Sequence, residues 1–291
     1  MDKPQITQAM IDAYDEYTHL TLDRRDFMRK LRMLAGSAGA AAVIAPMLAA
    51  SAARAAIVPA NDERLQAEDV TYRGAPSDMS AYMAVSRAAS GRLPSVIVIH
   101  ENRGLNEHIR DVTRRLALEG FLVLAPDLLS PAGGTPKDED MARQSIGELS
   151  QDITRSNLLA SFAFLRNHAR SNGNVGAVGF CWGGRQANLL AVAEPELKAA
   201  VAYYGAQAPA EDVPKINASL MLHYAGLDER INAGIDAYRK ALEENRKDFQ
   251  IFVYDNVNHA FNNDTSEARY NKEAADLAWQ RTVAFLREKL A

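Results

Sequence analysis

The sequence predicts a single-domain α/β fold with a doubly wound, mostly parallel sheet flanked by helices. Two observations support this prediction. Short apolar segments rich in β-branched residues alternate with longer segments of helical spacing, from about residue 65 to the end of the chain. Several apolar segments are unbroken runs, such as residues 95–100, and such runs suit central strands that are covered on both faces.

Length and composition fit a globular protein with a sizeable core. Of the 291 residues, 47% are hydrophobic and 24% are charged, which is an ordinary balance. The formal net charge of −4 argues against a nucleic-acid-binding surface. One cysteine cannot form an intramolecular disulfide, and six scattered histidines offer no zinc-type spacing. We therefore expect no metal, no organic cofactor and no nucleic-acid partner.

Residues 1–55 are typical of an export signal and are set apart from the fold. The adjacent arginines Arg24 and Arg25 are followed by Phe27, and an uncharged, alanine-rich run covers residues 33–53. Small residues at 53 and 55 have the spacing that a signal peptidase needs. The segment resembles a twin-arginine (Tat) signal, which a receptor reads as an address.

This resemblance implies that the precursor uses the Tat export machinery and that the mature chain, residues 56–291, is periplasmic or otherwise exported. Asp23 departs from the usual serine or threonine before the arginines. The alternative is a membrane anchor that is not cleaved, because the uncharged run is just long enough to span. Cleavage is favoured, since alanine contributes little to insertion and glycine and proline weaken it. We expect no stable membrane insertion.

The folded part begins with a predicted β-hairpin, residues 70–72 and 79–85, and continues as alternating strands and helices. Residues 128–150 begin as a loop rich in glycine and proline, and they form either a flap over the site or a solvated connection. The predicted strands are residues 95–100, 121–127, 174–178, 197–205, 219–224 and 249–254, and the predicted helices are residues 106–120, 153–170, 185–193, 231–245 and 268–290.

A glycine-flanked cysteine stands where the predicted strand 174–178 meets the helix 185–193. Residues 179–184 read Gly-Phe-Cys-Trp-Gly-Gly, the strand-turn-helix pattern of the nucleophile elbow in α/β-hydrolases. Small residues are needed there because the nucleophile takes a strained backbone conformation close to neighbouring backbone. Cys181 is therefore a candidate nucleophile, and the alternative is a small buried apolar residue.

Two further candidates follow later strands in the chain order nucleophile, acid, histidine. Asp228 comes after the strand 219–224, and His259 comes after the strand 249–254. In this interpretation Cys181 attacks an acyl carbon, His259 moves the proton and Asp228 holds the imidazole. Taken alone, Asp228 could be a helix cap and His259 an ordinary loop residue. Backbone N–H groups of Trp182 and of the loop near Asn102 would form the oxyanion hole.

Glu101 is a further candidate, because it comes directly after the strand 95–100, beside the predicted oxyanion hole. The alternative is a surface carboxylate that pairs with Arg103.

These segments together resemble the dienelactone hydrolases (carboxymethylenebutenolidases) over about residues 65–290. The resemblance implies a Cys–His–Asp triad that acts on lactones or enol esters. It also implies that the glutamate matching Glu101 helps to ionise a thiol that is neutral at rest, and that Tyr203 matches a tyrosine near the active site. The matching segments are residues 100–106, 125–128, 175–184, 203–205, 226–228 and 259–261.

Asn263 is a departure from the family pattern, in which an arginine at this position binds the substrate carboxylate. Arg143 is only a possible substitute for a second substrate-binding arginine. The sequence therefore predicts a hydrolase of lactones or small carboxylic esters that forms a thioester acyl-enzyme. The alternatives are a broad esterase or thioesterase with the same triad, and a non-catalytic binding protein with this fold.

Overall fold

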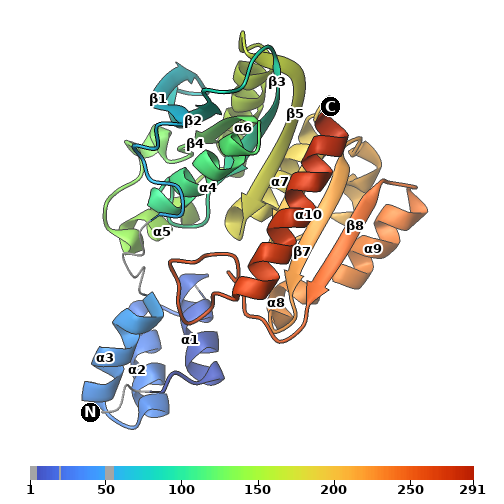
Figure 1. The fold of residues 1–291 in the computed structure, drawn as a ribbon. Coiled ribbons are helices and arrows are strands. Elements are labelled where there is room, and N and C mark those ends of the chain that lie inside the picture. Colours follow the sequence, from blue (N-terminus) through green and yellow to red (C-terminus); the bar gives the residue numbers. More distant parts are fainter. Residues whose placement is uncertain (1–4, 20, 50–55) are drawn as a thin grey trace.

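The computed structural model describes residues 5–19, 21–49 and 56–291, and its centre is an eight-stranded sheet (Figure 1). The strands lie in the spatial order β1-β2-β4-β3-β5-β6-β7-β8. β1 and β2 form the predicted antiparallel hairpin, β2 is antiparallel to β4, and every other pairing is parallel. The strands are β1 (Leu65–Arg73), β2 (Asp78–Ser86), β3 (Leu93–Ile99), β4 (Leu122–Pro126), β5 (Ser171–Phe180), β6 (Ala199–Tyr203), β7 (Ser219–Ala225) and β8 (Phe249–Tyr254).

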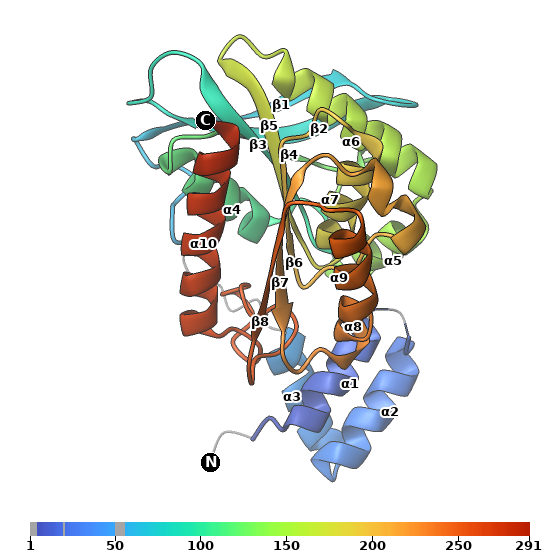
Figure 2. The same ribbon diagram turned by 90° about the vertical axis from the view of Figure 1, so that its right-hand side faces the viewer.

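Helices cover both faces of this sheet, as Figure 2 shows, and create two hydrophobic cores. Alternate residues of β3 point to opposite faces: Val96 and Val98 join the core under α4 and α10, whereas Ile97 and Ile99 join the core under α6, α7 and α9. This double burial explains the unbroken β-branched run. The helices are α4 (Glu107–Leu118), α6 (Gln151–Arg166), α7 (Trp182–Ala193), α9 (Ile235–Glu244) and α10 (Lys272–Leu290).

Two predicted segments differ in detail from the structure. The predicted helix 231–245 is divided into α8 (Glu229–Asn232) and α9, with Gly234 at the start of the second. The segment 128–150 contains a 3₁₀ turn (Ser130–Ala132) and the helix α5 (Glu139–Gly147). Asp138 caps α5 by accepting hydrogen bonds from the amides of the first turn. The few apolar residues of α5 obscured its helical period in the sequence.

The N-terminal segment folds into three helices, which Figure 1 shows at the carboxyl ends of the parallel strands. They are α1 (Gln8–Thr18), α2 (Arg24–Ala35) and α3 (Ala38–Ala49), and they share a small core. In that core Phe27 stacks on Tyr17 with ring centroids 4.7 Å apart. Residues 53–55, where cleavage was predicted, lie outside the described residues. The export signal stays a prediction.

In the described ranges, no individual helix has both the length and the apolar character needed to cross a membrane. Only α2 and α3 taken together pass such a test, and these two helices meet at an angle of 114°.

Candidate active site

Cys181 lies in the tight turn between β5 and α7, with φ 54° and ψ −114°. This conformation is strained for a residue with a side chain, and such strain is typical of functional turns. The flanking glycines are required by space: a Cβ atom at Gly179 would lie 1.9 Å from the carbonyl oxygen of Gly183. A Cβ atom at Gly183 would lie 2.3 Å from the carbonyl oxygen of Ile99. The turn therefore holds the sulfur at the carboxyl edge of the sheet.

His259 and Asp228 lie beside this turn and contact each other. His259 Nδ1 is 2.5 Å from Asp228 Oδ2, and both side chains are buried. The other carboxylate oxygen of Asp228 accepts from the Ile231 amide, so the residue is also the helix cap that the sequence offered as an alternative. The sulfur of Cys181 and a ring nitrogen of His259 lie within 4.8 Å of each other. His259 Nε2 has no hydrogen-bond partner among the described residues.

The charges at this site favour a thiolate beside an imidazolium. Burial raises the pKa of the Cys181 thiol, but the charges of His259 and His19 and the hydrogen bond with His19 outweigh burial and lower the pKa to about 6. Burial lowers the pKa of His259, yet the negative charges of Asp15, Asp228 and Cys181 raise it well above its usual value. Burial raises the pKa of Asp228, and the neighbouring His259 brings it below the ordinary range.

Glu101 is buried next to the same sulfur and not exposed at the surface. Its Oε2 accepts a hydrogen bond of 2.7 Å from Asn263 Nδ2, and its Oε1 lies 3.5 Å from the hydroxyl of Tyr204. Arg103, the alternative partner, forms an ion pair of 2.6 Å with Glu139. Asn263, which departs from the family pattern, therefore holds a carboxylate of the protein itself.

A cavity of about 290 Å³ opens beside Cys181 and receives side chains from several loops. Asn102 and Trp182 line it, as their predicted oxyanion role requires, and so does Arg143 of α5. Trp182 is the first residue of α7, and the amides of a first helical turn have no acceptor within the helix.

Tyr203, which the resemblance placed near the active site, is not among the residues that line this cavity. It ends β6 inside the core, where its hydroxyl lies 2.7 Å from Thr282 Oγ1. The next residue, Tyr204, has a positive φ of 39° and lines the cavity instead.

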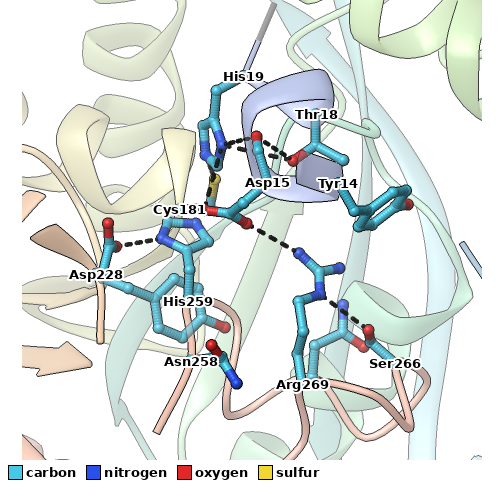
Figure 3. A network of polar contacts seen from close by, with 12 residues as sticks. Tyr14, Asp15, Thr18, His19, Cys181, Asp228, Asn258, His259, Ser266 and Arg269 are labelled. Atoms are coloured by element: carbon cyan, nitrogen blue, oxygen red, sulfur yellow. Dashed lines mark hydrogen bonds and ion pairs between the residues drawn. The ribbon is translucent and has the colours of Figure 1, made fainter. Parts of the chain in front are cut away.

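A second imidazole reaches the sulfur from the N-terminal segment, which the sequence had set apart as an export signal. His19 follows α1, and its Nε2 lies 3.4 Å from Cys181 Sγ. Figure 3 shows Cys181 between His19 and His259. Thr18 and His19 both line the cavity.

Two groups of side chains at this site have the donors that a metal ion needs. His19, Cys181 and His259 place two imidazole nitrogens and a sulfur within 4.8 Å of one another. Such soft donors suit zinc. Asp15, Asp228 and His259 form the second group. The fold thus assembles donors that are scattered in the sequence, and the first group coincides with the candidate nucleophile.

Comparisons with known proteins place this chain in a family. A model of the dienelactone hydrolase family matches residues 79–290. A putative carboxymethylenebutenolidase of Escherichia coli (strain K12) is 34% identical over 255 residues, covering 82% of this chain and 93% of that protein. A putative carboxymethylenebutenolidase of Salmonella typhi is 37% identical over 221 residues, covering 71% of this chain and 81% of that protein.

A solved structure supports the same assignment. The crystal structure of a putative dienelactone hydrolase from Klebsiella pneumoniae has a TM-score of 0.71 and 32% identity, covering 77% of this chain and 98% of that chain. The predicted α/β-hydrolase fold is confirmed. The chain belongs to the dienelactone hydrolase family and is, with that family, a carboxylic ester hydrolase.

Proposed function

We propose that this protein hydrolyses lactones or small carboxylic esters with Cys181 as nucleophile, through a thioester acyl-enzyme. One arrangement supports the proposal above the others. The sulfur lies on a strained turn beside the buried His259. Nδ1 of His259 is bonded to Asp228, and its Nε2 has no hydrogen-bond partner among the described residues. A nucleophile, a base and a group that orients the base are the parts that acyl transfer needs.

In the first half-reaction the Cys181 thiolate attacks the carbonyl carbon of the bound ester. The new C–S bond leaves negative charge on the carbonyl oxygen, which the amides of Trp182 and Asn102 would stabilise. The C–O bond then breaks, and His259 gives its proton to the leaving alkoxide. In a lactone this alkoxide stays attached to the acyl group.

In the second half-reaction water attacks the thioester carbon, and the now neutral His259 takes the proton from that water. The C–S bond breaks, and the acid product leaves a thiolate beside an imidazolium. Asp228 keeps the same nitrogen of His259 bonded through both steps, so the imidazole needs no reorientation.

We further propose that the preferred substrate carries a negative charge. Three guanidinium side chains line the cavity, those of Arg143, Arg185 and Arg230, and no aspartate or glutamate of the described chain is among its lining residues. Asn263 is buried against Glu101 and leaves this recognition to other side chains. Arginine pairs well with carboxylates, which supports a lactone or ester that bears a carboxylate.

Glu101 would assist the thiol from its buried position next to Asn263. The carboxylate lines a small cavity together with Cys181 and His259, close enough to influence the sulfur. The proposal is that a bound substrate disturbs the contact between Asn263 and Glu101, and that the freed carboxylate takes the thiol proton in those molecules in which Cys181 is still neutral.

The test compares wild type and Cys181→Ala on p-nitrophenyl acetate and on a lactone. We expect the variant to lose turnover to the background rate, and equal rates for both proteins would refute an enzymatic role for the cysteine. To test recognition of substrate charge, a carboxylated ester is compared with a neutral ester of equal size, and the carboxylated ester should have the lower KM. Arg230→Gln should reduce that difference, whereas an unchanged ratio would exclude recognition of the charge by this arginine.

From the sequence alone, we propose that the precursor is exported through the Tat pathway. Replacing Arg24 and Arg25 by lysine should retain the protein in the cytoplasm, as fractionation of cells would show. An unchanged distribution would contradict this proposal.

A further inference from the structure

The carboxyl end of α1 covers the catalytic sulfur without filling the cavity beside it. His19 Nε2 is 3.4 Å from Cys181 Sγ, and the His19 and His259 rings stand nearly perpendicular with centroids 4.7 Å apart. The sulfur therefore faces two imidazoles from opposite ends of the chain (Figure 3). Cys181 and His19 still line the cavity of about 290 Å³, so a substrate can approach the sulfur while α1 is in place.

Helix α1 is held at this position by several separate parts of the hydrolase fold. They include the loop after β3, helix α5 and the loop before α10. The contacts are Asn102 Nδ2 to the Thr18 carbonyl at 2.6 Å, Arg143 Nη1 to the Tyr17 carbonyl at 2.8 Å, and Arg269 Nη1 to Asp15 Oδ1 at 3.4 Å. Two of them fix the backbone directly before His19, and they therefore fix the place of the imidazole.

Asp15 orients the His19 ring. His19 Nδ1 is 2.7 Å from the Asp15 carbonyl oxygen and 3.7 Å from its Oδ2. Because Nδ1 is bonded in this way, the ring directs Nε2 at the sulfur. On the other side, the Asp228 carboxylate bonds Nδ1 of His259 directly. The site thus places two imidazoles on one sulfur, one held by a carboxylate and the other by a main-chain carbonyl with a carboxylate nearby.

We propose that His19 is a catalytic residue of this enzyme, a second imidazole that binds the Cys181 sulfur as thiolate, and that Asp15 is its positioning residue. The proposal rests on Cys181 being the nucleophile. His19 in its imidazolium form donates Nε2–H to the thiolate before attack and again when the thioester breaks. It keeps its proton throughout, while His259 carries the proton to the alkoxide and from the water.

One consequence concerns the N-terminal segment. Cleavage after residue 55 would remove His19 together with α1. In this proposal the form with the full rate retains the segment, and a cleaved form would be slower.

The test uses the full chain and four variants: His19→Gln, Asp15→Asn, Cys181→Ala and, as a matched control, His168→Gln. His168 precedes β5 at the opposite end of that strand from Cys181, and its Nδ1 accepts only a local hydrogen bond from the Arg170 amide. Two quantities are measured, the kcat and KM for p-nitrophenyl acetate and the rate of alkylation by iodoacetamide as a function of pH. Circular dichroism checks that each variant is folded.

The alkylation profile must be interpreted with every group around the sulfur in view. These groups are Asp15 and His19 at α1, Glu101 after β3, Tyr204 after β6, Asp228 after β7, His259 after β8 and Arg269 before α10. His19→Gln and Asp15→Asn change two of these groups and leave the sulfur in place.

We expect His19→Gln to lower kcat by about 10-fold or more, as the loss of one hydrogen bond to a charged group predicts. KM should change by less than about 3-fold, and the midpoint of alkylation should move to higher pH. Asp15→Asn should act in the same direction with a smaller effect, and His168→Gln should match wild type. The midpoint shift separates this role from a merely structural one.

Three results would overturn the inference. Wild-type kcat and an unchanged midpoint in His19→Gln would show that the contact is incidental. A higher kcat in that variant would show that α1 inhibits the enzyme. If Cys181→Ala retained full activity, the proposed function itself would fall, whereas an inactive Cys181→Ala beside a normal His19→Gln would reject only this inference. If His19→Gln fails to fold, the kcat and the alkylation midpoint of Asp15→Asn test the inference.

Discussion

The thiol of Cys181 should ionise near pH 6, and the pH dependence of its alkylation tests the charge arrangement of the site. The surrounding groups lower its pKa from an ordinary value of 9.0 to about 6. At pH 7 a thiol of pKa about 6 is roughly 90% ionised, whereas one of pKa about 9 is roughly 1% ionised. Since only the thiolate reacts, the rate with iodoacetamide should rise about tenfold per pH unit below pH 5 and level off above about pH 7.

His259→Gln removes the largest contribution that lowers this pKa and leaves the burial that raises it. The midpoint should therefore move up toward pH 9. At pH 7 the ionised fraction falls by up to about 90-fold. A more basic thiolate is also more nucleophilic, and a Brønsted coefficient of about 0.45 over three pH units restores roughly 20-fold. The rate at pH 7 should thus fall by only about fivefold.

The midpoint is consequently the diagnostic quantity, and the rate at one pH is not. A wild-type midpoint above pH 8 would refute a thiol pKa that the two histidines lower to about 6. A His259→Gln profile that superimposes on the wild-type profile would show that His259 does not face the sulfur in solution.

Cys181→Ser should keep the fold and lose most activity, because a serine hydroxyl does not ionise near neutral pH; comparable turnover by the serine variant would reject the thiolate mechanism. Glu101→Ala should slow acylation in a pre-steady-state assay, whereas the exposed Glu148→Ala should not, and equal acylation rates would deprive Glu101 of its role. Gly179→Ala should lower the free energy of unfolding in urea by about 3 kcal/mol or more, since its Cβ would meet the Gly183 oxygen at 1.9 Å. In the control Gly39→Ala in α3, a Cβ meets nothing within 4 Å, so the free energy of unfolding should rise by less than about 1 kcal/mol. Similar losses of stability in the two variants would contradict the steric argument.

The sheet could be predicted because its signals are local. β3 is buried on both faces by helices, and its composition alone shows this. Cys181, Asp228 and His259 could be brought together for a related reason: each follows a strand of the sheet, and parallel strands present their carboxyl ends at one edge. Their contact, unlike their proximity, needed the structure.

Other features depend on contacts between distant residues and left little trace in the sequence. The partner of Glu101 is Asn263, 162 positions away, and nothing near Glu101 indicates it. Tyr204 lines the cavity in place of the predicted Tyr203, and its positive φ just after β6 is not visible in the sequence.

Helix α1 was missed for a different reason. The charges and the apolar run of residues 1–55 suit an export signal, and this interpretation removed the segment from the search for a site. The spacing of Met10, Tyr14 and Tyr17 was the available signal, because an apolar face with two tyrosines at helical spacing indicates a helix that packs on something.

The burial of Phe27 has a consequence for how the chain is sorted in the cell. This residue belongs to the proposed export signal together with Arg24 and Arg25, yet only 3% of it is exposed, because it packs against Tyr14 and Tyr17. A receptor that reads the phenylalanine must first pull α2 away from α1, and α1 carries His19. If both proposals hold, recognition for transport and a complete active site would draw on the same pair of helices, and one molecule would not offer both at once.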